Sequence, residues 1–382
     1  MFKRVLMAVA VAAAVSAPAF AEVSINGSAE MDLFVRTHQA GAEGTTLAEE
    51  IAIVVNVDGK DKLDNGDTLK WRLAQKVATD WRYDGWGGRE AWIGYAGNWG
   101  ELRFGTQFTN AYLTLDWPYG SKAQGNLSAD FGAVNDKWKD AITYFSPEFG
   151  GFNFTLQYKI GADTAEQNVP AAAGKWEIDQ KTGAITQGKP TPASTKGATL
   201  TNGYDIGING AFGPVAVNAG WQRQNDAVFG QIPVAAGGSG DVIKLAEVAN
   251  GSSSDVYFIG ARGTFGDFSV KALYKNNTWK ATGEKLTVDQ YLVGGTYSMG
   301  KNAFSLGWQE VLDGTYNGKD LDNSVQQVSA QWDYSLSKNT GAFLQARYHM
   351  YGNDNQLFKV DGSAGYKTSD TLRVLVGTWT GF

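Results

Sequence analysis

The chain has 382 residues, with 33 Lys and Arg against 39 Asp and Glu, a formal net charge of −6 at pH 7 and no cysteine. The acidic balance argues against nucleic-acid binding, which depends on clustered cations that neutralise phosphates. Without cysteine there are no disulfides, no thiolate chemistry and no cysteine-based metal site. Glycine is frequent, with 48 residues, and proline is rare, with 8, which favours many strands joined by tight turns.

The first residues have the composition of an export signal. Lys3 and Arg4 precede an apolar run over residues 5–15, and Ala19 and Ala21 supply the small residues of a cleavage site. The run is shorter than the ~20 apolar residues that a membrane-spanning helix needs. We therefore expect residues 1–21 to be a cleaved signal peptide and residues 22–382 to form a single domain. No later segment is continuously apolar, which argues against a helical membrane protein.

From residue 22 onward the chain alternates between apolar and polar side chains with the period of a β-strand. In residues 152–160 every even position is large and apolar and every odd position is polar, and Asn65-Gly66 is a hairpin signal. The pattern predicts sixteen strands, near residues 23–33, 51–58, 69–76, 88–96, 100–107, 137–145, 152–160, 204–212, 215–224, 255–265, 268–275, 288–298, 303–309, 325–336, 340–348 and 371–382.

The predicted connections alternate between short and long, as in an antiparallel up-and-down β-barrel of the outer membrane. A soluble β-sandwich is the alternative, but its polar face would point outward. In a membrane barrel the charged face must enclose water, because Arg or Lys facing lipid at the midplane costs roughly 2–4 kcal/mol. Strand residues such as Lys76, Lys159 and Lys271 all fall on the polar faces. Aromatic residues near predicted strand ends, such as Trp221, fit the interfacial belts of such barrels.

The segment from about Phe108 to Asp136 is too long for a plain connection between two strands, so we expect a functional insert that folds into the lumen and narrows it. The insert carries three acids, Asp116, Asp130 and Asp136, each of which could also be a merely solvated loop residue. Cations project from nearby strands, namely Lys70, Arg72, Arg103, Lys137 and Lys139. Opposed charges across a narrow channel would select solutes by size and charge.

Five stretches in this order resemble one family, the trimeric Gram-negative general porins, and in particular their betaproteobacterial and neisserial branch. These stretches are DKLDNG (61–66), REAWIGY through FG (89–105), YFSPEFGGF (144–152), YSLSKNT (334–340) and VGTWTGF (376–382). The resemblance covers residues 22–382 and implies a water-filled sixteen-stranded outer-membrane barrel, a homotrimer, and a third loop folded inward as an eyelet.

The same resemblance implies roles for particular residues. Arg89 matches a wall arginine of the family, and Lys137 stands where another arginine is usual. Val54 and Thr106 replace two further arginines, so the sequence leaves both anion and cation preference open. Phe382 would be read by the barrel-assembly machinery, and the surroundings would be outer-membrane lipid and lipopolysaccharide.

The function we expect is passive diffusion of ions and small hydrophilic solutes, without enzymatic activity. A solute-specific channel is one alternative. A barrel hydrolase, for which His349 would be the only candidate catalytic histidine, is another. No metal or other cofactor is expected. Residues 61–67 resemble a calcium loop but lack its distal Glu, and the two histidines, His38 and His349, do not make a metal site.

Overall fold

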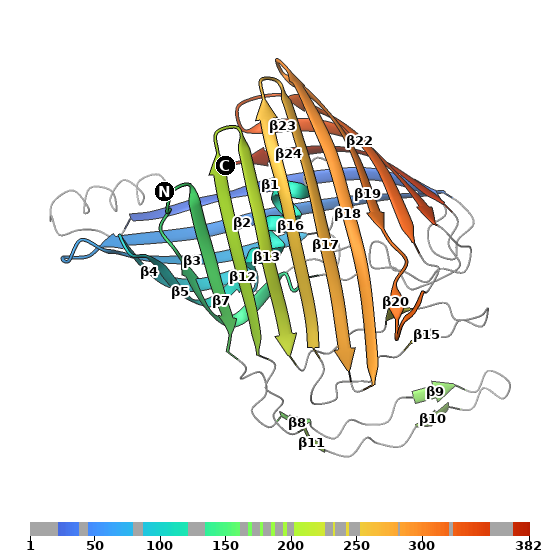
Figure 1. Ribbon diagram of the computed structural model, residues 1–382, viewed down its shortest axis with the longest axis horizontal. Helices are drawn as coiled ribbons and strands as arrows, with labels where there is room; N and C mark the ends of the chain where they lie inside the picture. The colour runs from blue at the N-terminus through green and yellow to red at the C-terminus, as the bar shows by residue number, and fades with distance from the viewer. Residues whose placement is uncertain are drawn as a thin grey trace.

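The computed structural model describes residues 22–37, 45–78, 87–120, 134–160, 167–169, 176–178, 185–187, 194–196, 202–225, 232–233, 242–243, 253–281, 283–320, 324–351 and 370–382. In this part of the chain the main sheet has eighteen strands, and sixteen of them form a closed antiparallel barrel (Figure 1). The predicted signal peptide, residues 1–21, lies outside the described residues.

The barrel strands are β1 (Glu22–Thr37), β2 (Thr45–Lys62), β3 (Thr68–Ala78), β4 (Glu90–Gly97), β5 (Gly100–Phe108), β6 (Lys137–Phe145), β7 (Phe152–Lys159), β12 (Gly203–Phe212), β13 (Val215–Asn225), β16 (Ser253–Phe265), β17 (Phe268–Ala281), β18 (Glu284–Met299), β19 (Asn302–Val311), β22 (Val325–Ser335), β23 (Thr340–Tyr351) and β24 (Thr371–Gly381). The connection between β19 and β22 contains a small hairpin, β20 (Thr315–Tyr316) and β21 (Lys319–Asp320), which pairs with β18. Short strands in other connections pair separately: β8 (Gln167–Val169) with β11 (Ser194–Lys196), β9 (Trp176–Ile178) with β10 (Ile185–Gln187), and β14 (Ile232–Pro233) with β15 (Val242–Ile243).

Pairing of the first and last strands closes the barrel. β1 pairs with β24 from Ser28–Gly381 to Arg36–Arg373, and on its other side it pairs with β2. Every barrel strand thus has two neighbours, and its backbone hydrogen bonds are made without an open edge, as lipid requires. The predicted strand number and antiparallel order are confirmed.

One predicted loop proves to be strand. The sequence pattern placed a loop between residues 275 and 288, but β17 and β18 continue through this region as a long hairpin in which Trp279 pairs with Leu286. Both side chains are buried on the inner face and continue the alternation. The polar Asn276 and Asn277 hid that alternation in the sequence.

The two faces of the barrel differ in the sense expected for a membrane protein. Outward-facing side chains such as Ile25 (68% exposed) and Leu306 (68%) are apolar, whereas inward-facing Gln222 and Gln290 are 1% and 0% exposed. A soluble β-sandwich would show the opposite pattern, and that alternative is excluded. Among the described residues, no helix is long and apolar enough to cross a membrane.

Aromatic rings form cross-strand pairs on the outer face near both ends of the barrel. Toward the long connections, the ring centroids of Tyr158 and Tyr204 lie 5.3 Å apart and those of Tyr274 and Tyr291 lie 5.2 Å apart. Toward the short turns, the Phe152 and Phe212 rings are 4.8 Å apart. Such bands fit the two water–membrane interfaces of an outer-membrane barrel.

Candidate functional site

The insert predicted between β5 and β6 is described at residues 108–120 and 134–136, hereafter the inner segment. It enters the barrel as two short helical turns, α2 (Asn110–Thr114) and the π-helix η1 (Leu115–Tyr119). Figure 1 shows these turns within the ring of strands. Thr109 caps α2 because its hydroxyl accepts the Tyr112 N–H at 3.1 Å. The same hydroxyl donates to the Asn135 carbonyl at 2.6 Å, and the Thr109 N–H donates to the Asp136 carbonyl at 2.9 Å. The start and end of the inner segment are therefore joined.

A buried carboxylate fixes α2 to the barrel wall. Asp205 of β12, which is 0% exposed, accepts the Ala111 N–H at 2.9 Å and the Gln222 side-chain N–H at 3.1 Å. The Gln222 side chain in turn accepts the Asn135 N–H at 2.8 Å and donates to the Asn135 carbonyl at 3.2 Å. Both ends of the inner segment thus meet the same pair of wall residues.

The η1 turn is tied to the wall farther along. The Tyr119 hydroxyl donates to the Asn218 side-chain oxygen at 2.9 Å, and the Lys271 ammonium donates to the Pro118 carbonyl at 3.3 Å. Burial raises the pKa of Tyr119 to about 12, and the positive charge of Arg262 opposes this rise. The hydroxyl therefore stays protonated and able to donate at neutral pH.

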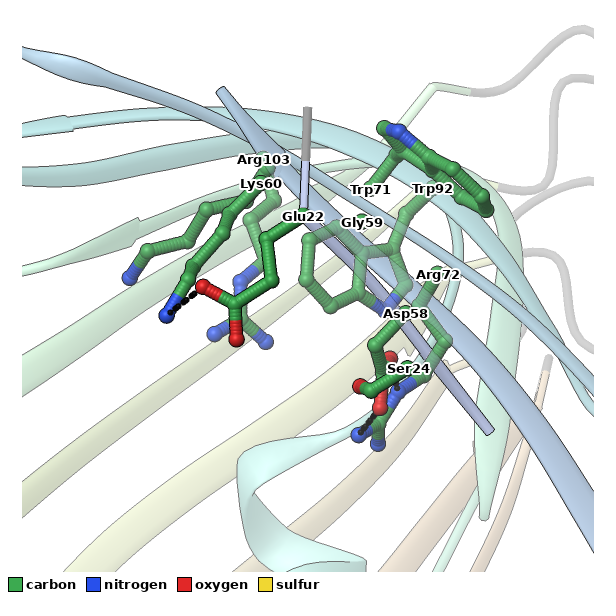
Figure 2. Close-up of a pocket in the computed structure, with 10 residues that line it drawn as sticks. Glu22, Ser24, Asp58, Gly59, Lys60, Trp71, Arg72, Trp92 and Arg103 are labelled. Carbon is green, nitrogen blue, oxygen red and sulfur yellow. Dashed lines mark hydrogen bonds and ion pairs between the residues drawn. The ribbon is translucent and has the colours of Figure 1, made fainter. Parts of the chain in front are cut away.

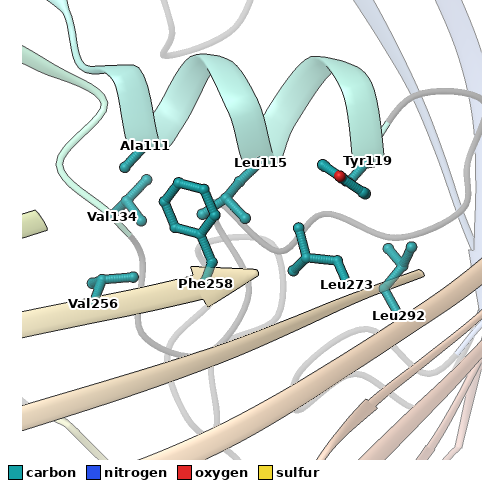
Figure 3. Packing of buried hydrophobic residues seen from close by; sticks show 8 residues of the cluster. All are labelled: Ala111, Leu115, Tyr119, Val134, Val256, Phe258, Leu273 and Leu292. Carbon is teal, nitrogen blue, oxygen red and sulfur yellow. The ribbon is translucent and has the colours of Figure 1, made fainter. Parts of the chain in front are cut away.

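Apolar contacts complete this attachment (Figure 3). Buried side chains of the inner segment pack against inward-facing side chains of β16, β17 and β18. The cluster consists of Ala111, Leu115, Tyr119, Val134, Val256, Phe258, Leu273 and Leu292. Burying an aliphatic or aromatic side chain contributes roughly 1.5–3 kcal/mol, so the apolar patch is a main attachment of the inner segment. On the opposite side of α2, Leu113 is 48% exposed.

Gly260 of β16 makes room for the Tyr119 ring, because a Cβ at this position would lie 2.6 Å from the ring. Replacing Gly260 by alanine should displace Tyr119 and its hydrogen bond to Asn218, and overpacking of this kind costs about 1–3 kcal/mol. We expect a lower thermal unfolding temperature by circular dichroism. The matched control is Gly295→Ala, where the nearest atom to the new Cβ is 3.7 Å away. Equal unfolding temperatures for the two variants would contradict the packing described.

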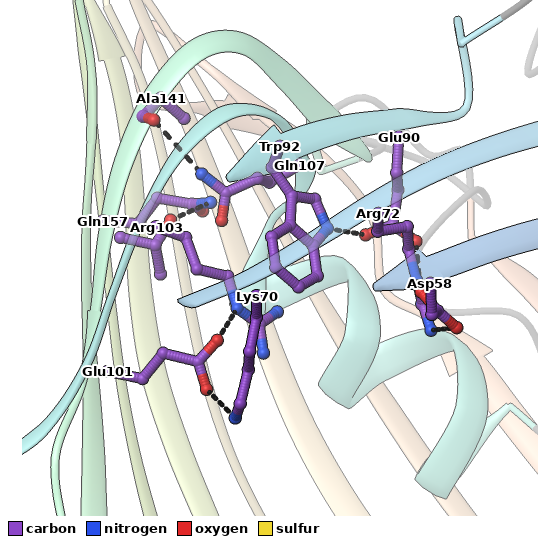
Figure 4. Close-up of polar contacts among 11 residues, drawn as sticks. Asp58, Lys70, Arg72, Glu90, Trp92, Glu101, Arg103, Gln107, Ala141 and Gln157 are labelled. Carbon is purple, nitrogen blue, oxygen red and sulfur yellow. Dashed lines mark hydrogen bonds and ion pairs between the residues drawn. The ribbon is translucent and has the colours of Figure 1, made fainter. Parts of the chain in front are cut away.

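A network of ion pairs covers the inner face of β2–β5 (Figure 4). The Arg72 Nε lies 2.6 Å from an Asp58 oxygen, and its Nη1 lies 3.2 Å from a Glu90 oxygen. The Lys70 ammonium lies 2.8 Å from Glu101. Arg103 also pairs with Glu101, and its guanidinium stacks over the Trp92 ring at 4.1 Å. We call this set the wall network: Asp58, Lys70, Arg72, Glu90, Glu101 and Arg103.

Four members of the wall network, Asp58, Lys70, Arg72 and Arg103, line a recess of about 270 Å³ at the inner surface (Figure 2). Glu22 and Lys60, at the edge of this recess, form another ion pair at 2.9 Å. The predicted wall cations Lys70, Arg72 and Arg103 are thus gathered in one place, but each has a carboxylate partner from the same wall. The local charge is close to balanced.

Period-2 spacing was the signal that could have revealed these carboxylates. Glu101 lies two residues before Arg103, and Glu90 two residues before Trp92, so each pair shares a face. Asp58 falls on the inner face of β2, where it pairs across the sheet with Arg72. The sequence interpretation looked for acids only on the insert.

The other predicted cations lie elsewhere. The guanidinium of Arg89 lies 5.0 Å from the centroid of the Phe108 ring, and Lys137 donates from its ammonium to the Gly88 carbonyl at 2.8 Å. Lys139 is exposed beside Asp140, whose φ of 52° marks the irregularity where the β5–β6 register shifts. These three residues are therefore outside the wall network.

Two of the predicted acids lie near Tyr112, as Arg89 does. Burial raises the pKa of the Tyr112 hydroxyl, as do the charge and hydrogen bond of Asp116 and the charge of Asp136, whereas Arg89 lowers it. Tyr112 therefore remains protonated and donates to Asp116. The Asp136 carboxylate accepts the Lys137 N–H at 2.8 Å. Asp130, the third predicted acid, lies outside the described residues.

At the chain end, Phe382 continues the pairing with β1, because its N–H and carbonyl both bond to Gly27 at 3.0 Å. Its side chain is 56% exposed. His349 faces inward on β23, with Nδ1 3.4 Å from the Thr371 hydroxyl. Within the described ranges, no group of three or more His, Cys, Asp or Glu side chains is placed to hold a metal ion.

Comparison with known proteins decides the family. A family model described as Gram-negative porin matches residues 8–356. The chain belongs to this porin family.

Relatives of this porin include a chitoporin of Vibrio furnissii, 24% identical over 361 residues, which cover 87% of this chain and 89% of that protein. The major outer membrane protein P.IA of Neisseria meningitidis is 24% identical over 343 residues, covering 85% of this chain and 82% of that protein. The porin is an outer-membrane channel protein, as the sequence interpretation expected.

Solved structures share its fold. An anion-selective porin from Comamonas acidovorans superposes with a TM-score of 0.70 at 17% identity, covering 95% of this chain and 100% of that chain. The trimer form of OmpT, an outer membrane protein of Vibrio cholerae, gives a TM-score of 0.64 at 15% identity, covering 95% and 99%.

Proposed function

We propose that this porin lets ions and small hydrophilic solutes diffuse through an eyelet between the inner segment and the wall network. The observation that carries the proposal is the attachment of α2 and η1 inside the barrel through Asp205, Asn218 and the apolar cluster. A segment held in the lumen reduces the open cross-section, and the charged groups of the wall network then act on whatever passes.

Planar-bilayer recording of the purified porin tests this function. Stepwise conductance in KCl is expected. Added neutral solutes that are small enough to enter the eyelet should lower this conductance. Protein that inserts but never conducts would overturn the proposal.

The proposed assembly is a homotrimer, because the family is typically trimeric and one structural neighbour is a trimer form. Conductance steps are then expected in groups of three. We also propose lipopolysaccharide and outer-membrane lipid as the surroundings of the apolar outer face. The exposed ring of Phe382 at the end of β24 would serve as the signal for the barrel-assembly machinery.

A second candidate is a channel specific for one class of solute, as suggested by the chitoporin relative. Trp92, which faces the lumen beneath Arg103, would supply the aromatic surface for a sugar ring. Chito-oligosaccharides would then block the KCl current at low concentration, and Trp92→Ala would relieve the block. An unblocked current would favour the general channel.

We propose no enzymatic activity, since the channel families and folds it resembles carry none as a rule. A fluorogenic ester assay, with His349→Ala as the comparison, would reveal a hydrolase if one were present.

A further inference from the structure

The register of three neighbouring strands places three arginines side by side. Arg36 of β1 pairs directly with Arg373 of β24, and Arg373 pairs directly with Arg347 of β23. We call these residues the arginine row. It lies near the barrel end that carries the long connections, because Arg36–Arg373 is the last β1–β24 pair on that side.

Strand alternation shows that the arginine row faces the lumen. The neighbours Val35, Val374 and Tyr348 are exposed on the outer, lipid-facing side. Leu375 and Gln345, each two residues from an arginine, are buried on the inner side. Side chains two residues apart share a face, so all three arginines point inward.

Three like charges in direct cross-strand contact are unfavourable in themselves. Adjacent strands lie about 4.8 Å apart, and like charges directly opposite each other destabilise a sheet. The Phe34 ring offsets part of this repulsion, because the Arg36 and Arg373 guanidinium carbons lie over it at 4.7 and 5.2 Å. The ring thus holds the two guanidinium groups close together.

Two further strands flank the row. Arg36 pairs on its other side with Thr46 of β2, and Arg347 pairs on its other side with Ser329 of β22. The buried Nε of Arg373 has no hydrogen-bond acceptor among the described residues. The arginine row therefore presents concentrated positive charge and hydrogen-bond donors to the lumen.

We propose that the arginine row binds multivalent oxyanions that enter the channel, such as phosphate chains or polycarboxylates. Guanidinium groups bind carboxylate and phosphate oxygens in a two-pronged geometry. The row extends over about 10 Å, from two strand spacings, so a solute with several anionic groups contacts all three arginines while a monovalent anion contacts fewer. This proposal rests on the proposed channel function, because the ligand reaches the row only through the lumen.

The test measures block of the KCl current in planar bilayers by sodium tripolyphosphate and, separately, by citrate, with acetate at equal ionic strength as the monovalent comparison. The proposal is supported if either polyanion blocks the unmodified porin at a concentration at which acetate, at equal ionic strength, leaves it open. Which polyanion blocks better distinguishes a phosphate-chain ligand from a polycarboxylate.

Arg373→Gln should raise the half-blocking concentration about tenfold, because a hydrogen bond to a charged group is worth more than 1.4 kcal/mol and that energy is a factor of ten. Arg373→Lys keeps the charge but loses the two-pronged guanidinium geometry. Its half-blocking concentration should therefore lie between those of the unmodified porin and Arg373→Gln. Lys319→Gln is the matched control, since it removes an exposed cation of the same end of the barrel outside the lumen row. Removing one of three like charges relieves repulsion, so these variants are expected to fold.

Equal half-blocking concentrations for Arg373→Gln and the unmodified porin, or the absence of polyanion block in a channel that conducts KCl, would overturn the arginine-row proposal. Absence of KCl conductance would instead reject the channel function on which it rests.

Discussion

Replacing Asp205 by alanine should loosen the inner segment while leaving the barrel intact. The substitution leaves the buried Ala111 N–H and the Gln222 side chain without their shared acceptor. Each buried donor without a partner costs about 1–3 kcal/mol, which is enough to populate positions of α2 away from the wall. The barrel itself depends on strand pairing and should keep its circular-dichroism spectrum.

Single-channel recording measures this effect. We expect noisier current, more substates and a changed mean conductance for Asp205→Ala. The control is Asp205→Asn, which keeps a side-chain oxygen for the Ala111 N–H and should behave more like the unmodified porin. A quiet, unchanged current in the alanine variant would mean that Asp205 does not position the inner segment.

Neutralising Arg72 should shift ion selectivity toward cations. Asp58 and Glu90 both pair with Arg72, so Arg72→Gln leaves two lumen-facing carboxylates without their cation. Coulomb's law gives about 0.7 kcal/mol between unit charges 6 Å apart in water, which corresponds to about a threefold change in the ratio of cation to anion permeability. At physiological salt the Debye length of ~8 Å leaves this interaction only partly screened.

The reversal potential in a KCl gradient reports the selectivity. The double variant Arg72→Gln/Asp58→Asn restores the local charge and should bring the reversal potential back toward that of the unmodified porin. Identical reversal potentials for all three proteins would show that the wall network does not line the conducting path.

Much of the barrel was predictable because lipid imposes a simple pattern. Alternation in residues 152–160 reflects one face toward lipid and one toward water, and the hairpin signal at Asn65-Gly66 marks the turn between β2 and β3. The same rule does not predict which positions of the inner face are apolar. Val256 and Phe258 point inward because the inner segment covers them, and that contact joins residues far apart in the sequence.

The site was harder to predict because its pairs form across strands. The sequence indicates a basic wall from its cations Lys70, Arg72 and Arg103. The register of the strands, however, determines that the carboxylates of Asp58, Glu90 and Glu101 lie against these cations. Register also creates the arginine row, whose members lie more than 300 residues apart in the chain at its extremes. Strand periodicity predicts the face of the sheet on which each arginine lies, but it does not predict which residue lies beside that arginine on the next strand.

The central claim is that the inner segment lines the conducting path. Chemical modification of a cysteine placed at Leu113 tests this claim most directly. The chain has no cysteine, so Leu113→Cys would be its only thiol. Leu113 lies on the side of α2 away from the wall, and an outward-facing control is Ile259→Cys, which is 61% exposed on the lipid face. A charged thiol reagent added during bilayer recording should reduce the current through Leu113→Cys in discrete steps and leave Ile259→Cys unchanged. An unchanged current through Leu113→Cys, with modification confirmed by mass spectrometry, would contradict the account.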